Sequence, residues 1–337
     1  MELRFSDGVG RVVEVDDRAT VLDAALAGGV PLVNQCGSGS CGTCVARIRG
    51  GEVVMATDHP IALLPVEIEA GDCLTCSAFV RSDARFDLDY PSSLLFDPGP
   101  RCWNGVVEEV VPVSATVRRL TVEVTSNAAA LSFRAGQYMR VRVPGTTEWR
   151  SYSMSTTPRD LPHISFLVRS FPGGAMTSYL GERSAVGDEI ELEGPLGSFS
   201  LQERTGPHLM VAGGTGLAPM LSMLDVLRTA GRPLPPILLC FACSTEEGLF
   251  CLDELELREF WMPSLKVRVG VSRPTAEYDG VVATPVELVD DADLDLPDLV
   301  AYLCGPPGMV ANARQRLLDA GVPESSIHAE QFRVSAT

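Results

Sequence analysis

The chain has 337 residues, of which 27 are Lys or Arg and 44 are Asp or Glu, so its formal net charge is −17. At about 100–200 residues per domain, this length predicts two or three domains, and a hydrophobic content of 45% is that of a globular chain. The negative charge argues against nucleic acid as a partner, because phosphate backbones require a basic surface. The chain has neither an apolar run of about 18 residues nor a basic leader followed by an apolar one. We therefore expect a cytoplasmic protein that does not enter membranes.

The first 80 residues are predicted to form short strands around one helix. Asp7-Gly8 separates two alternating segments and is typical of a hairpin turn. Residues 20–27 are expected to form a helix that has Thr20 as its N-cap and ends at Gly28-Gly29. A loop rich in glycine and cysteine follows at residues 36–44. The strands predicted here are residues 3–5, 11–15 and 45–49.

The rest of the chain divides into three further parts. Residues 81–101 contain Pro91, Pro98 and Pro100 without a clear period, which predicts a linker. A series of strands follows, at a spacing typical of a barrel or sandwich: residues 105–110, 118–124, 138–143, 164–169 and 189–193. Strands then alternate with helices, which predicts a parallel α/β layout: strands 209–212, 237–241, 266–271 and 300–304, and helices 219–230, 252–261 and 307–320. We therefore expect three domains, at residues 1–95, 101–204 and 206–337.

Five of the ten cysteines crowd the first part of the chain: Cys36, Cys41, Cys44, Cys73 and Cys76. The first three have the spacing C-x4-C-x2-C, which is the spacing of plant-type ferredoxins, and Cys76 is a candidate fourth ligand. Glycines 37, 39 and 42 let backbone amides approach the sulfur atoms of a cluster closely. A zinc site built from two C-x2-C pairs is the alternative. It would leave Cys36 unused, and the 28 residues between the pairs exceed the usual 15–20.

These motifs, together with Leu74-Thr75-Cys76, resemble the plant-type ferredoxin module over about residues 3–90. The resemblance implies an α+β β-grasp fold that holds a [2Fe–2S] cluster. It assigns four cysteines as iron ligands: Cys36, Cys41, Cys44 and Cys76. Cys73 is then an ordinary thiol.

Two motifs in the middle of the chain point to a flavin. In the first, Arg150 can hold a pyrophosphate, the ring of Tyr152 can stack on a flat heterocycle, and Ser153 offers a hydroxyl. The second is a tight glycine turn at residues 171–177 that opens a helix and is suited to an anion. Together they resemble the R-x-Y-S and G-G-x-x-[ST] motifs of the ferredoxin–NADP reductase superfamily.

That resemblance implies a six-stranded antiparallel β-barrel with FAD at its edge. Arg150 and the turn would hold the phosphates, Tyr152 would pack on the isoalloxazine ring, and Ser153 would lie near its N5 atom. The turn residues assigned to the cofactor are Gly173, Gly174, Met176 and Thr177.

A nicotinamide nucleotide is indicated by two loops of the last domain. Residues 209–219 give a strand, a glycine turn and a helix, with Pro219 at the position of the third glycine of the usual dinucleotide motif. This departure, and a second loop that reads C-G-P-x-x-M, resemble the same reductase family. The residues that the resemblance assigns to the nucleotide are Gly214, Thr215, Gly216, Pro219, Cys304, Gly305, Pro306 and Met309.

The C-terminal Glu330 and Phe332 match a family E-x-F ending close to the flavin. The resemblance thus implies that Ser153, Cys304 and Glu330 take part in hydride transfer. Ser244 stands where many relatives carry an arginine for the 2′-phosphate of NADP, no base is nearby in the sequence, and Glu246 and Glu247 follow it. Since acids repel a phosphate, we expect NADH to be preferred.

The order of ferredoxin, FAD and NAD modules resembles the reductase components of bacterial ring-hydroxylating dioxygenases, such as those for benzoate, toluate and anthranilate. It implies a path from NADH through FAD and the cluster to a Rieske-type terminal oxygenase. Three alternatives share the motifs: the reductase of a soluble di-iron monooxygenase, a stand-alone flavin reductase with a vestigial cluster, and a non-enzymatic redox sensor or carrier. The histidines have no evident triad context: His59, His163, His208 and His328.

Overall fold

The computed structural model describes residues 1–16, 18–34, 39, 43–56, 63, 65–92, 101–202, 206–231 and 234–332. The described residues up to Ser92 belong to one compact unit, and Arg101–Phe332 form a second one. Among the described residues, none of the helices combines the length and the apolar character needed to cross a bilayer.

The N-terminal unit is a mixed sheet with one main helix against it. The strand order is β2-β1-β7-β3-β5, and a separate pair is formed by β4 and β6. The predicted hairpin is confirmed, since β1 and β2 pair antiparallel, and so is the helix α1 (Val21–Ala27), whose N-cap Thr20 accepts the Asp23 N–H at 3.1 Å. The element bounds are β1 (Glu2–Arg4), β2 (Gly10–Val12), β3 (Val45–Gly50), β4 (Val53–Met55), α2 (Pro65–Glu69), β5 (Asp72–Leu74), β6 (Ala78–Val80) and β7 (Arg85–Asp87).

The predicted linker at residues 81–101 is wrong at its start. Residues 85–87 form β7, which lies between β1 and β3 and places Phe86 in the core of the unit. A strand of three residues is too short to show a period, so sequence alternation could not reveal it. Residues 93–100 lie outside the described residues.

The first half of the second unit is a six-stranded antiparallel sheet that closes on itself. Its strand order is β11-β10-β13-β8-β9-β12, and a bridge between Met154 and Phe166 joins the two edges. The predicted barrel is confirmed. Arg150–Ser153 of the flavin motif lie within one of its strands, β11. The bounds are β8 (Arg101–Pro112), β9 (Val117–Val124), β10 (Tyr138–Arg142), β11 (Trp149–Ser153), β12 (His163–Arg169), α3 (Ala175–Ser178) and β13 (Glu189–Leu196).

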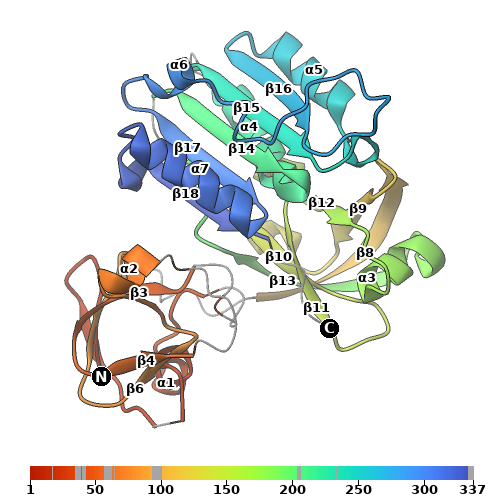
Figure 1. The fold of residues 1–337 in the computed structure, drawn as a ribbon. Helices are drawn as coiled ribbons and strands as arrows, with labels where there is room; N and C mark the ends of the chain where they lie inside the picture. The colour runs from red at the N-terminus through yellow and green to blue at the C-terminus, as the bar shows by residue number, and fades with distance from the viewer. Residues whose placement is uncertain are drawn as a thin grey trace. The chain divides into compact units, whose positions relative to one another are not determined.

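The second half of this unit is a five-stranded parallel sheet in the order β16-β15-β14-β17-β18 (Figure 1). Successive strand residues face opposite sides, so Met210 packs with α4 and α5 while Leu209 packs with α6 and α7. The predicted α/β layout is confirmed, and the edge strand β18 is an addition. The bounds are β14 (His208–Gly213), α4 (Leu217–Arg228), β15 (Ile237–Cys243), α5 (Leu252–Trp261), β16 (Leu265–Val271), α6 (Asp291–Leu294), β17 (Val300–Gly305), α7 (Pro307–Asp319) and β18 (Ile327–Gln331).

Candidate functional site

Two of the four predicted iron ligands lie side by side in the N-terminal unit. Cys44 directly precedes β3, Cys76 lies in the turn between β5 and β6, and both side chains are buried. Their Sγ atoms are 3.2 Å apart, and the Thr75 N–H donates to the Cys44 carbonyl at 2.9 Å. Two thiolates on one tetrahedral metal ion stand about 3.8 Å apart, given metal–sulfur bonds of about 2.3 Å. The pair therefore fits two ligands of one iron after a small opening. Cys36 and Cys41 lie outside the described residues.

The surroundings of this pair suit a thiolate centre. The Gly39 N–H donates to Cys76 Sγ at 3.2 Å, and Gly39 has a φ of +73°, which glycine adopts without strain. Cys73 faces the core of the unit on β5, and burial raises the pKa of its thiol to about 12. Among the described residues, no three His, Cys, Asp or Glu side chains form a metal-binding group. Cys73 thus does not join Cys44 and Cys76, which disfavours the zinc alternative.

Three predicted site residues of the second unit come together from three strands. Ser153 ends β11, Cys304 lies on β17, and Glu330 lies opposite Cys304 on β18. Ser153 Oγ donates to Glu330 Oε2 at 3.1 Å, and Glu330 is buried at 3% exposure. Burial and the neighbouring Glu330 hold the pKa of the Cys304 thiol well above its usual value. Cys304 is therefore a neutral thiol at physiological pH and not a nucleophile.

The other two residues of the flavin motif lie on β11 as well. The Arg150 guanidinium donates to the Glu148 carboxylate, and to the Trp149 carbonyl at 3.0 Å. Tyr152 is half-buried with its ring 6.3 Å from that of Phe166, and burial raises the pKa of its hydroxyl. The planar donor fork of Arg150 fits a phosphate, and the ring of Tyr152 fits a flat heterocycle.

The glycine turn of the flavin motif is stabilised by a hydrogen bond between two of its own residues. The Phe171 N–H donates to Thr177 Oγ1 at 2.8 Å, so this hydroxyl already holds the turn. Gly173 has a φ of +74°, with open space where a Cβ would stand. Met176 is buried in the barrel core, so only its backbone can face a cofactor. At Gly174 an added Cβ would lie 3.1 Å from the Thr177 hydroxyl. The turn thus leaves room for a group at Gly173.

The glycines of the nucleotide turn have two different roles. A Cβ on Gly216 would lie 2.1 Å from the Cys304 carbonyl oxygen, and one on Gly213 would lie 2.7 Å from Met309 Sδ. Gly214, with a φ of +55°, has nothing within 4 Å of its Cβ position. Gly216 therefore lets the turn after β14 approach the end of β17, and Gly213 leaves space for Met309 of α7. Gly214 leaves an open backbone beside them. This cradle fits a dinucleotide.

The remaining residues assigned to the nucleotide flank this cradle. Thr215 is half-buried in the short 3₁₀ turn before α4, and Pro219 is buried in the first turn of α4, where the missing N–H has no helical partner to lose. Pro306 is exposed before α7. The Phe332 N–H donates to the Gly305 carbonyl at 2.8 Å, which ties the chain end to the cradle.

The loop after β15 differs from the sequence expectation in one respect. An arginine does come close to Ser244, because the backbone N–H of Arg273 donates to the Ser244 carbonyl at 2.8 Å. β15 and β16 are parallel neighbours, so the loops that follow them meet at the same edge of the sheet. Beside these loops, the Glu246 carboxylate accepts two hydrogen bonds from Thr275, one from its hydroxyl and one from its backbone N–H at 3.1 Å. The bond from the hydroxyl is the main cause that lowers the pKa of Glu246. A carboxylate and an arginine therefore share this edge.

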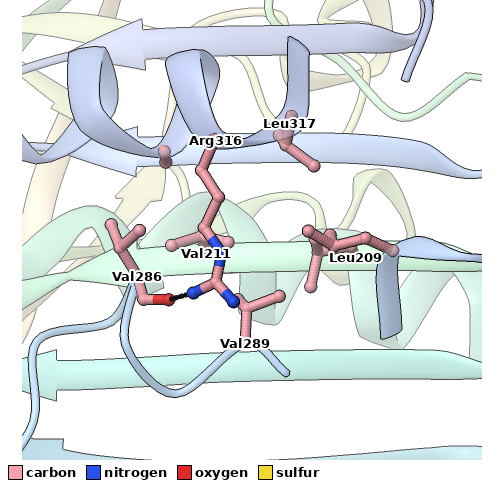
Figure 2. A pocket seen from close by; sticks show the side chains of 8 residues that line it. Leu209, Val211, Val286, Val289, Arg316 and Leu317 are labelled. Carbon is pink, nitrogen blue, oxygen red and sulfur yellow. Dashed lines mark hydrogen bonds between the residues drawn. The ribbon is translucent and has the colours of Figure 1, made fainter. Parts of the chain in front are cut away.

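A small cavity lies on the face of the parallel sheet that α6 and α7 cover, between β14 and α7 (Figure 2). Its volume is about 10 Å³, the size of about one water molecule, so it does not hold a nucleotide. The guanidinium of Arg316 lies across it and donates to the Val286 carbonyl at 2.8 Å.

The described histidines have structural surroundings. His163 pairs with Glu108 at 2.8 Å, whereas His208 and His328 pack against the ring of Tyr302. His59 lies outside the described residues. Among the contacts between the barrel and the parallel sheet that the sequence did not predict, the Ser222 hydroxyl on α4 donates to the Thr156 carbonyl at 2.6 Å. No sequence signal marks it, since Ser222 lies in an apolar helix.

Three family descriptions match consecutive parts of the sequence. Residues 4–81 match a 2Fe-2S iron-sulfur cluster binding domain, residues 104–201 an oxidoreductase FAD-binding domain, and residues 210–315 an oxidoreductase NAD-binding domain. The predicted cofactors, FAD, a [2Fe–2S] cluster and NADH, agree with these three domains.

Proteins of known role are similar over nearly the whole chain. The toluate 1,2-dioxygenase electron transfer component of Pseudomonas putida is 32% identical, with 98% of each chain covered. The reductase component of phenol 2-monooxygenase from Pseudomonas sp. strain CF600 is 31% identical, covering 97% of this chain and 93% of the relative. The crystal structure of the Amycolatopsis cytochrome P450 reductase has a TM-score of 0.72 at 26% identity, with 99% of each chain covered. The chain therefore belongs to the family of the dioxygenase electron transfer components, and it is an oxidoreductase that uses NADH, FAD and a [2Fe–2S] cluster.

Proposed function

We propose that this chain carries electrons from NADH, through FAD and the [2Fe–2S] cluster, to the terminal oxygenase of a ring-hydroxylating dioxygenase system. The observation that supports this most directly is the similarity, over 98% of both chains, to the toluate 1,2-dioxygenase electron transfer component. The proposal divides the work among three domains, at residues 1–95, 101–204 and 206–337.

When bound, FAD would supply the exchange of a hydride for single electrons that is needed between a nicotinamide and an iron–sulfur cluster. The chain supplies the surroundings for it. Arg150 and the turn at 173–177 would hold its phosphates, and Tyr152 would pack on its ring. The hydrogen bond from Ser153 to Glu330 fixes a polar group beside the neutral thiol of Cys304. No side chain has to act as an acid or base in this scheme.

Four cysteines hold the cluster in this proposal: Cys36, Cys41, Cys44 and Cys76. The pairing of Cys44 with Cys76 supports the last two. Residues 1–95 contain 14 Asp or Glu and seven Arg, a net charge of −7. We propose a Rieske-type oxygenase as the acceptor, with a basic docking surface that this charge steers into contact.

A soluble di-iron monooxygenase is the second candidate acceptor. It is favoured by the similarity to the phenol 2-monooxygenase reductase component, which is almost as close as that to the toluate protein. The two candidates separate when the purified chain is mixed with each oxygenase component: NADH-driven substrate turnover is expected with the Rieske protein and not with the di-iron protein.

The electron path is tested by Cys41→Ser. NADH-dependent ferricyanide reduction is expected to stay largely intact, because the flavin can reduce this acceptor directly, whereas cytochrome c reduction is lost. Persistent cytochrome c reduction would mean that electrons do not leave through the cluster. Anaerobic NADH titration of the wild type gives the cofactor content, and a preparation without iron or flavin overturns the proposal as a whole.

A further inference from the structure

The turn that carries Cys76 places a second side chain against the same sulfur atom. Ser77 follows Cys76, and its side chain is 4% exposed. Its hydroxyl lies 3.6 Å from Cys76 Sγ. Two backbone hydrogen bonds hold Ser77 in place: its N–H donates to the Leu74 carbonyl and its carbonyl accepts the Ala56 N–H, both at 2.9 Å. The hydroxyl is therefore kept within reach of the sulfur.

The direction of this hydrogen bond follows from the chemistry of a metal ligand. A cysteine that binds iron is a thiolate and has no proton to give. The hydroxyl of Ser77 then has to be the donor when the cluster is bound. It joins the Gly39 N–H, which donates to the same Sγ at 3.2 Å. Two donors thus converge on Cys76 Sγ in a buried site, where hydrogen bonds to charge are stronger than in water.

We propose that the Ser77 hydroxyl is a positioning residue that raises the reduction potential of the cluster through Cys76. Reduction adds one negative charge to the cluster and its sulfur ligands, so a donor on a ligand stabilises the reduced form more than the oxidised form. The inference rests on the proposed role of Cys76 as an iron ligand. It concerns how readily the cluster takes an electron, which the sequence motifs do not specify.

The test is a redox titration of the full-length holoprotein, followed by the electron paramagnetic resonance signal of the reduced cluster. In Ser77→Ala, the ratio of reduced to oxidised cluster at a fixed potential is expected to fall about threefold to tenfold, where tenfold equals about 59 mV for a one-electron couple. Ser92→Ala is the matched control. Ser92 is 6% exposed in the same unit, but its hydroxyl donates to Asp7 at 2.7 Å. The ratio of reduced to oxidised cluster should therefore not change in this variant.

A second pair of variants protects the test against poor folding. Ser77→Thr and Ser77→Val have nearly the same shape and differ in the hydroxyl, so the Thr variant is expected to titrate at the higher potential. The inference is overturned if Ser77→Ala, with full iron content, has a ratio of reduced to oxidised cluster within twofold of the wild type at the same potential. It is also overturned if the Thr and Val variants have the same reduction potential. A wild type without iron or signal would instead contradict the proposed function.

Discussion

The candidate cluster site and the candidate hydride-transfer site are assembled in opposite ways. Cys44 and Cys76 are 32 residues apart, and both lie in or next to tight turns of one small unit. Ser153 and Glu330 are 177 residues apart and meet because a barrel strand and the edge strand of a parallel sheet end at the same place. The first site depends on individual ligands, and the second on the packing of whole strands.

This difference predicts different responses to substitution. A thiolate ligand makes a bond that no neighbouring group can replace, so its loss should abolish the site. A hydrogen-bonding group beside a cofactor contributes part of the stabilisation of the reacting state, so its loss should lower a rate. The four predictions below test this contrast, beginning with the largest effect.

Cys76→Ala should remove the cluster, whereas Cys73→Ala should keep it. Cys76 lies beside Cys44 in the cluster turn, while Cys73 is packed in the core on β5. The measurement is iron per chain, with the wild type binding two irons in a [2Fe–2S] cluster. Iron loss in Cys73→Ala with retention in Cys76→Ala would reverse our ligand assignment.

Gly216→Ala should destabilise the second unit by about 2–3 kcal/mol, because its Cβ would lie 2.1 Å from the Cys304 carbonyl oxygen, a backbone atom that cannot move away alone. A lower melting temperature, by about 5–10 °C, follows for a unit of this size and can be read from the release of flavin fluorescence. Gly308→Ala is the control. Gly308 lies in α7, where its Cβ position is open and alanine is favoured by about 0.5–1 kcal/mol. Equal melting shifts would refute the close approach.

How far the sequence could lead differs between the sites for the same reason. C-x4-C-x2-C is a local pattern, so the cluster motif is readable without a fold. The spacing of short strands also predicted the barrel, and the alternation of strands with helices predicted the parallel sheet, because both patterns extend over many residues. β7 and β18 could not be predicted, because neither sequence shows a regular alternation of apolar and polar residues. The contact of Ser153 with Glu330 and the approach of Arg273 to Ser244 depend on strand order, which composition does not encode.

Ser153→Ala should lower the rate of flavin reduction by NADH about tenfold, equal to about 1.4 kcal/mol. The change removes the hydroxyl that donates to the buried side chain of Glu330, so this side chain is no longer held in one position. Stopped-flow reduction under saturating NADH measures the rate. Ser222→Ala removes another buried hydroxyl of the same unit, which bonds the Thr156 carbonyl, and should lower stability while leaving the rate unchanged. A comparable slowing in both variants would show that buried hydroxyls act here through stability alone.

Glu246→Gln should weaken the preference for NADH over NADPH about threefold, the smallest of these effects. Glu246 is half-buried at the carboxyl edge of the sheet, and the hydrogen bonds from Thr275 keep its pKa low, so its charge persists throughout the neutral range. A 2′-phosphate at this edge would meet that charge, and Arg273 lies in the neighbouring loop, where its backbone N–H bonds the Ser244 carbonyl. Gln keeps the hydrogen bonds to Thr275 and removes the repulsion, so kcat/KM with NADPH should rise while that with NADH stays nearly constant. Arg273→Ala separates the two influences. If its main effect is to lower kcat/KM with NADPH, the arginine attracts the phosphate, and the preference reflects a balance of both charges. If neither variant changes the ratio, the nucleotide is discriminated elsewhere along the strand edge.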